Sequence, residues 1–554
     1  MVVPELRAWR AARPHLARVA RAVRPRLARM GQVVGPRAQR IGEAVRPRAT
    51  RLPGAVKPHV TRVARAVGPG SGGLTAPQLA AVAATVGLAL AAGAATAAGP
   101  WDSSGQRTAE RDRAAAWGRR GGADHARNSG TAADAPAPAP SAAPVLAGLG
   151  TAANTTKSAP FATNLIAVLD KLLDDHSLGS RRTAVVLDVA TGKRLYGKGA
   201  DDALTPASTT KIATAVAVLS AAGPDHRLTT RTVLEPGKDT VVLVGGGDPT
   251  LTARKDDAGG WASLRTLADA TAAALKKRHL ASVTLSYDAS LFTGEAVHEI
   301  GANPNLAPVT ALTADEGRAD NSTSGPAPRG TDPAGDAART FAGLLRDRGI
   351  RTSGPGASQA KATSRAQPLA SVQSPPLSAV VERMLTNSDN DIAEALARQT
   401  ALATGGRPSF DGGAAAIAAQ LKKLALPLKG AQFHDGSGLN RADKLSADLL
   451  TALLATAGSA SHPELRTVLT GLPVAGFTGT LSDRYEDAAQ RSGIGVVRAK
   501  TGSLTGVNTL AGTLVDVDGR LLAFAFLTDG SMDQTAARAA LDRAAAALAG
   551  CGCR

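Results

Sequence analysis

The chain has 554 residues, of which 20% are charged, and a formal net charge of +18. Only 3% of its residues are aromatic and only two are cysteine. Few aromatic side chains argue against a surface that stacks on nucleic acid bases. Two cysteines are too few for a disulfide framework or a zinc site.

Residues 1–74 form a basic arm with an internal repeat. Residues 1–70 hold 16 arginines and lysines against two glutamates, so most of the net charge lies there and not in the rest of the chain. Proline recurs every eleven residues from Pro14 to Pro69. This period keeps apolar residues on one face of a helix. Each proline would interrupt that helix. We expect either a kinked cationic array on anionic membrane lipid or a disordered basic arm, and no nucleic acid partner.

The next two segments predict an anchor and a linker. No charged residue occurs from Gln78 to Gly99, which is enough for one membrane span, so residues 75–99 predict a transmembrane anchor. The basic arm then lies in the cytoplasm and the rest of the chain outside the cell. A cleaved signal sequence, and therefore a secreted protein, is the alternative. Residues 100–160 are rich in alanine and proline and predict an extended linker.

A first motif lies in "LTPASTTKIATAVAVL", from Leu204 to Leu219. The apolar run from Ile212 predicts a buried helix. Ser208 and Lys211 are three residues apart and would share one face of that helix. Burial and the positive end of the helix dipole both lower the pKa of a lysine, which would help Lys211 act as a base. The pattern S-x-x-K is common, and an ordinary helix cap is its other interpretation.

Strand patterns on either side of a long central segment predict a split domain. Residues 161–222 and 380–549 would form the catalytic domain, with one sheet built from a hairpin before the first motif and a hairpin turning at Asp518–Gly519. Between them, residues 223–379 contain strand patterns such as "TVVLVGGG" and "ASVTLSYDAS" and a helix pattern at "ASLRTLADATAAALKKR". This segment is long enough to be an inserted domain with β-structure.

Two further motifs complete a set. "MLTNSDNDIAEALARQ" places Ser388 and Asn390 at a turn before a helix, and "VVRAKTGSLTGVNTLAG" places Lys500, Thr501 and Gly502 on a strand. S-x-x-K, S-D-N and K-T-G in this order are shared by penicillin-binding proteins and serine β-lactamases. Each motif alone is weak, but the ordered set is specific.

The long gap between the first and second motifs resembles the serine-type D-Ala-D-Ala carboxypeptidase/endopeptidase family, the class C low-molecular-mass penicillin-binding proteins. The stretches "GGGDPTLT", "YDASLFTG", "HDGSGLNRADKLSA" and "LPVAGFTGTLSDRY" are similar to that family as well. The resemblance covers residues 161–549. One departure is "LTADEGRAD" at 312–320, where the family usually has an asparagine-rich run. The resemblance implies an α+β transpeptidase fold, with an antiparallel sheet covered by helices on both faces and an all-helical part.

The chemistry of these residues and the resemblance agree on their roles. Ser208 would attack the D-Ala-D-Ala bond, with Lys211 as its base. Backbone N–H groups of Ser208 and Ser503 would form an oxyanion hole. Ser388 and Lys500 would return a proton to the leaving amine, and Asn390 would bind the substrate amide. Lys500, Thr501, Gly502 and Ser503 belong to the strand that would bind the terminal carboxylate.

The expected function is a D,D-carboxypeptidase on peptidoglycan stem peptides, with D,D-endopeptidase activity on crosslinks left open. Penicillins and other β-lactams should acylate it, and no cofactor or metal is expected. One alternative is a serine β-lactamase, but no Glu-x-x-Leu-Asn stretch follows Ser388 to supply a deacylating base. Another is a membrane-anchored scaffold with a penicillin-binding fold. Ser437 in "HDGSGLN" resembles a hydrolase serine, but it lacks the G-x-S-x-G context, so we expect a loop beside the site.

Overall fold

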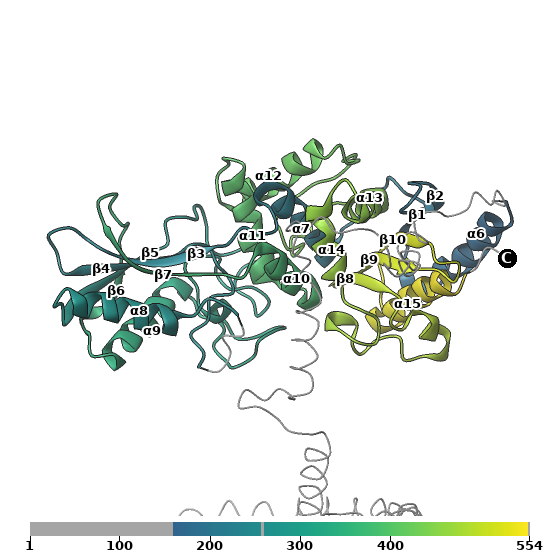
Figure 1. Ribbon diagram of the computed structural model, residues 1–554. Helices are drawn as coiled ribbons and strands as arrows, with labels where there is room; N and C mark the ends of the chain where they lie inside the picture. The colour runs from purple at the N-terminus through teal and green to yellow at the C-terminus, as the bar shows by residue number, and fades with distance from the viewer. Residues whose placement is uncertain (1–158, 256–259, 552–554) are drawn as a thin grey trace, which may run out of the picture. The chain divides into compact units, whose positions relative to one another are not determined.

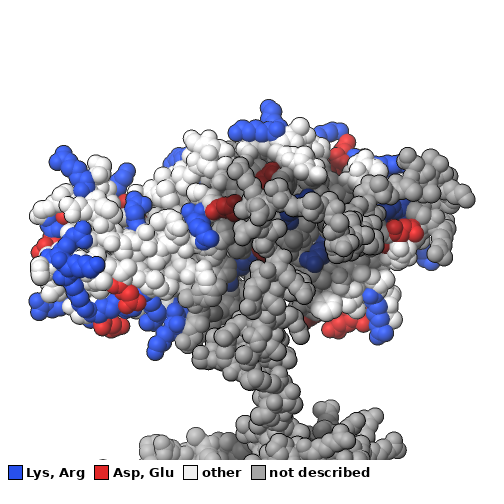
Figure 2. Space-filling view, in the orientation of Figure 1, with Lys and Arg blue, Asp and Glu red and all other residues white. Residues whose placement is uncertain are grey.

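The computed structural model describes residues 159–255 and 260–551. The predicted arm (1–74), the predicted anchor (75–99) and the linker up to residue 158 lie outside the described residues. Among the residues that are described, no helix is both long and apolar enough to cross a membrane. Figure 2 shows acidic and basic side chains mixed over the visible described surface.

The first sheet is built from both ends of the described chain (Figure 1). It is antiparallel throughout, with the order β2-β1-β10-β9-β8. Its strands are β1 (Arg181–Asp188), β2 (Arg194–Lys198), β8 (Arg498–Leu504), β9 (Val507–Val515) and β10 (Leu521–Asp529). Both predicted hairpins are present in it. Strand β8, which carries the third motif, lies at one edge of the sheet.

Apolar side chains cover both faces of this sheet, because neighbouring residues of a strand point to opposite faces. Val185 packs into a core with Ala525 and Leu527 on one face, whereas Val186 packs with Phe524 and Phe526 on the other. The second face is covered by α6 (Ala159–Leu173) and α15 (Gln534–Gly550). This arrangement confirms the predicted α+β fold with an antiparallel sheet between helices.

The first face packs against the helical part of the protein, which holds the first two motifs. Its helices are α7 (Thr210–Ala222), α10 (Leu377–Asn387), α11 (Asn390–Ala403), α12 (Phe410–Lys423), α13 (Ala447–Gly458) and α14 (Arg466–Thr470). Every residue of α7 from Thr210 to Leu219 is buried, as the apolar run predicted.

A second sheet is formed entirely from residues 229–373, between α7 and α10 in the chain. Its order is β6-β5-β4-β3-β7, and β4, β5 and β6 are parallel. The strands are β3 (Thr229–Leu234), β4 (Thr240–Val244), β5 (Ser282–Asp288), β6 (Arg351–Gln359) and β7 (Gln367–Gln373). Helices α8 (Leu264–Lys277) and α9 (Pro333–Asp347) connect the parallel strands, as parallel pairing requires, and share a core with them.

Candidate active site

Ser208 lies in a tight turn that leads directly into α7, three residues before Lys211. Ala207 to Thr209 form a short 3-10 helix, and Ala207 has a left-handed φ of +47°, which is uncommon for a residue with a side chain. Two bonds to the Pro206 carbonyl hold the turn: Thr209 Oγ1 donates at 2.6 Å and Thr509 Oγ1, from β9, donates at 2.9 Å. The strained turn therefore presents Ser208 at the end of the buried helix.

Lys211 lies in the first turn of α7 and is completely buried. Its Nζ is 3.0 Å from Ser208 Oγ, 2.6 Å from Asn390 Oδ1 and 2.7 Å from the Ser437 carbonyl oxygen. Burial lowers the pKa of Lys211 to about 8, although Asp435 and then Glu394 act in the opposite direction. A lysine with this pKa is partly neutral near pH 7, as a general base must be.

The second motif lies where α10 ends and α11 begins. Ser388 caps the end of α10 in a left-handed conformation, with φ +58°, and Asn390 is the first residue of α11. This bend turns both side chains toward the motifs on α7 and β8. Asn390 accepts from Lys211, as described above, and its Nδ2 donates to the Asn305 carbonyl at 3.0 Å.

The third motif lies on the edge strand β8. Lys500 Nζ donates to Ser388 Oγ and to the Thr501 carbonyl, both at 2.8 Å, and Thr501 Oγ1 is 2.9 Å from Thr480 Oγ1. Lys500 is fully buried. Burial first, and then the charge of Lys211, lower the pKa of Lys500 well below its ordinary range.

Gly502 is where β8 meets the turn that carries the serine. A Cβ atom at this position would lie 2.1 Å from Thr509 Oγ1, 2.7 Å from the Pro206 carbonyl oxygen and 3.1 Å from the Ser208 nitrogen. Only a residue without a side chain fits there. Close approach of the backbone therefore explains the glycine of the motif. From the sequence, Gly502 was predicted only as part of the strand that binds the carboxylate.

The structure brings most of the predicted residues together at one cavity of about 410 Å³. Ser208, Ser388, Asn390, Thr501 and Ser503 line it directly, while Lys211 and Lys500 lie beneath it as buried partners of two of these serines. Four arginines also line the cavity, namely Arg318, Arg329, Arg484 and Arg538, and the first three form ion pairs with Glu316, Asp391 and Asp542. A serine with a buried base can transfer an acyl group.

Ser437 lies in a loop beside the site, as predicted, but it makes a contribution that the sequence did not indicate. Its side chain is fully buried and its carbonyl oxygen binds Lys211. Two buried carboxylates fix this loop: the Ser437 backbone N–H donates to Glu394 at 2.8 Å and to Asp435 at 3.0 Å. Asp435 is itself 3.1 Å from His298 of the 223–379 segment. Because every residue has a backbone carbonyl, the amino-acid sequence could not predict this contact with Lys211.

Comparison with solved structures identifies the class of fold. Penicillin-binding protein 4 from Haemophilus influenzae superposes with a TM-score of 0.57 at 23% identity, over 70% of this chain and 98% of that one. A complex of the same protein with a β-lactam gives a TM-score of 0.55 at 22% identity. This similarity shows that the described part has the fold of a penicillin-binding protein.

Sequence comparison then gives the family. The model of the D-Ala-D-Ala carboxypeptidase 3 (S13) family matches residues 165–330 and 319–549. A carboxypeptidase from Mycobacterium tuberculosis is 35% identical over 428 residues, which are 76% of this chain and 90% of that protein. A D-alanyl-D-alanine carboxypeptidase from an Actinomadura species is 30% identical over 66% of this chain and 81% of that protein. The chain belongs to the S13 family and is a serine-type D-Ala-D-Ala carboxypeptidase.

Proposed function

We propose that Ser208 is the nucleophile of this carboxypeptidase and that Lys211 is its general base. The observation that carries this proposal is the set of three contacts of Lys211 Nζ. A neutral amine has two N–H donors and one lone pair. The Ser437 carbonyl and Asn390 Oδ1 can only accept, so they take both donors. The lone pair then faces the Ser208 hydroxyl, 3.0 Å away, and can remove its proton.

The acylation step follows from this geometry. Ser208 Oγ forms a bond to the carbonyl carbon of the penultimate D-alanine while its proton passes to Lys211. The developing oxyanion would bind the backbone N–H groups of Ser208 and Ser503, and the close approach at Gly502 keeps these two segments together. When the C–N bond breaks, the Ser388 hydroxyl gives its proton to the D-alanine amine and takes one from charged Lys500, 2.8 Å away.

In this proposal, residues of β8 bind the terminal carboxylate of the substrate. Lys500 supplies a cation, and Thr501 and Ser503 supply hydroxyl groups at the cavity. Arg538 of α15 adds a second cation, since its Nη2 is 3.2 Å from Ser503 Oγ. A bound carboxylate favours the charged form of Lys500 and offsets its burial. Asn390 would bind the amide on the acyl side of the scissile bond, and water would then release the acyl group.

Penicillins would acylate Ser208 because their strained amide and carboxylate mimic the D-Ala-D-Ala substrate. Cleavage of crosslinks by D,D-endopeptidase activity would use the same acylation step. Labelling the protein with a fluorescent penicillin and mapping the modified peptide by mass spectrometry tests this directly. The label should lie on Ser208. A label on Ser437, or no label on the folded protein, would refute the assignment. Release of monomers from a crosslinked dimer tests the endopeptidase activity.

We further propose that the arm (1–74) contacts anionic membrane lipid and that residues 75–99 anchor the enzyme with its catalytic part outside the cell. Sixteen basic residues in positions 1–70 support this, since each is worth about 1 kcal/mol near an anionic leaflet. A peptide of residues 1–70 should gain helix signal with anionic vesicles, but not with neutral ones, and salt should release it. A native protein that starts beyond Ala98 would contradict the anchor and indicate a secreted form.

A further inference from the structure

The turn that carries Ser388 and Asn390 is connected to the 223–379 segment through the residue between them. Asp389 is buried, with 6% of its surface exposed, and its Oδ1 accepts from the Ile392 backbone N–H at 3.0 Å, capping α11. Among residues 159–255 and 260–551, no lysine, arginine or histidine forms an ion pair with it. A buried carboxyl without a cation needs another kind of partner.

That partner is Glu316, from the short 3-10 turn Asp315–Gly317 of the 223–379 segment. One carboxylate oxygen from each of Glu316, Asp389 and Asp391 lies within 4.8 Å of the other two. Asp391 has its own cation, because Arg329 Nη2 is 2.9 Å from its Oδ2. A carboxyl oxygen of Glu316 and one of Asp389 are close enough for a side-chain hydrogen bond between them to shift the pKa of both groups. Two carboxylates cannot share a hydrogen bond unless one of them carries a proton.

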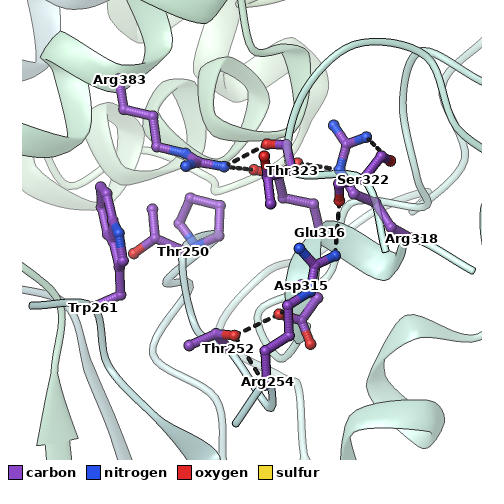
Figure 3. A pocket seen from close by; sticks show the side chains of 11 residues that line it. Thr250, Thr252, Arg254, Trp261, Asp315, Glu316, Arg318, Ser322, Thr323 and Arg383 are labelled. Carbon is purple, nitrogen blue, oxygen red and sulfur yellow. Dashed lines mark hydrogen bonds and ion pairs between the residues drawn. The ribbon is translucent and has the colours of Figure 1, made fainter. Parts of the chain in front are cut away.

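The charge of this pair lies on Glu316. Arg318 Nε is 2.8 Å and Arg383 Nη2 is 2.9 Å from its two carboxylate oxygens, and Figure 3 shows Glu316 between these arginines. Although burial acts in the other direction, its contacts with Asp389, Arg383 and Arg318 hold the pKa of Glu316 below its usual range. Burial, followed by the charge of Glu316, raises the pKa of Asp389 well above its usual range. Asp389 is therefore the proton donor and Glu316 the anionic acceptor.

We propose that Glu316 is a positioning residue for the reaction: it accepts a hydrogen bond from protonated Asp389 and so fixes the turn that places Ser388 beside Lys500 and Asn390 beside Lys211. This proposal rests on the roles proposed above for Ser388 and Asn390. The backbone is left-handed on both sides of the Glu316–Asp389 contact. The φ angle is +56° at Glu316 itself and +58° at Ser388, the residue before Asp389. Such conformations persist only where surrounding contacts hold them.

Three variants of the whole chain separate this role from helix capping. Asp389→Asn keeps a cap and an N–H donor toward Glu316. Asp389→Ser keeps a good cap but is too short to reach Glu316 as well. Glu316→Ala removes the acceptor. The rate of penicillin acylation at Ser208 and kcat on a D-Ala-D-Ala peptide would be measured for each, together with the thermal unfolding midpoint.

We expect Asp389→Asn to retain acylation within about threefold of the wild type, and Asp389→Ser and Glu316→Ala to lose roughly 10- to 100-fold, the range for one lost hydrogen bond to a charged group. The matched control is Asp315→Asn, in the same turn, whose carboxylate contacts Thr252 and Arg254 instead. It should leave acylation unchanged.

Equal rates for the Asn and Ser variants would overturn the proposal, because capping alone would then explain Asp389. Wild-type acylation in a folded Glu316→Ala protein would overturn it too. If Glu316→Ala does not fold, the Asn and Ser pair still decides. These outcomes differ from failure of the proposed function, which would appear as a wild-type protein that penicillin does not label at Ser208.

Discussion

The two sheets of this protein contribute to the site in different ways. The antiparallel sheet carries Lys500, Thr501 and Ser503 on an edge strand and supports the Ser208 turn through Thr509. The segment that contains the second sheet supplies no reacting group, but it contributes Asn305, Arg318 and Arg329 to the cavity wall. The reacting groups and part of the cavity wall thus come from different parts of the chain. Substitutions in the first part should change the rate of the chemical step, whereas those in the second should act through position or not at all.

Loss of the nucleophile should have the largest effect. Ser208→Ala leaves Lys211 and the cavity in place but removes the attacking oxygen, so D-alanine release should fall by on the order of 10³-fold or more. Release of D-alanine from a pentapeptide and labelling by fluorescent penicillin would measure it. Unchanged release would show that another group attacks, and Ser437→Ala provides the comparison because its role rests on the backbone carbonyl.

Lys500→Ala should weaken substrates with a free D-Ala carboxylate by on the order of 10²-fold, the scale of a fixed charge-assisted contact near the reacting centre. A substrate with an amidated terminus should lose much less, because it offers no anion to the lysine and loses only the contribution of Lys500 to proton transfer. The measurement is kcat/KM for the matched pair of peptides. Equal losses for both peptides would indicate that Lys500 contributes only to proton transfer through Ser388 and not to carboxylate binding.

Glycines in the two sheet-containing parts offer a direct contrast. Gly502→Ala forces a methyl group against the Pro206 carbonyl and the Ser208 nitrogen, so acylation should fall by roughly tenfold or more, with overpacking costing about 1–3 kcal/mol of stability. Gly343→Ala is the control. It lies within α9, where the nearest atom to an added Cβ is 3.8 Å away on the flexible Arg346 side chain. That variant should keep full activity and gain stability. Equal activity of the two variants would contradict close approach at Gly502.

A smaller effect is expected from pH. Lys211 has a pKa of about 8 in the folded protein, lowered by burial from an ordinary value of 10.5. Only its neutral form can accept the Ser208 proton, so the acylation rate should fall about tenfold per pH unit well below that value. The unfolded chain binds more protons between the two pKa values, so this lysine makes the free energy of unfolding rise as the pH increases through that window. Stopped-flow acylation against pH would measure the first effect. A rate that does not change below pH 8 would show that Lys211 is not the base.

The sequence predicted the parts of the site that depend on residue type and local order. The three motifs identified Ser208, Lys211, Ser388, Asn390 and Lys500, and the structure places these residues around one cavity. The two hairpins and the buried helix followed from apolar periodicity. The backbone conformation at Ser208 did not, because the turn with left-handed Ala207 is held in part by a hydrogen bond from Thr509 of β9, which is remote in sequence.

Contributions from tertiary contacts could not be predicted. The Ser437 carbonyl and the Asn305 carbonyl act through backbone oxygen, which every residue has. Glu316 stood out only as part of the "LTADEGRAD" departure from the family pattern. Its role depends on the fold bringing it to Asp389, and no spacing rule connects these two residues.

The pairing of β1 with β10 has a consequence for the order in which the molecule can assemble. Arg181 is opposite Asp529, so the strand that precedes the serine cannot complete its hydrogen bonds until nearly all of the chain has been synthesised. The 229–373 sheet is continuous in sequence and can form earlier. Closure of such distant contacts is slow because the loop entropy is lost before the contacts are gained. A chain emerging from the ribosome therefore passes most of its synthesis with the nucleophile made but the catalytic centre not yet assembled.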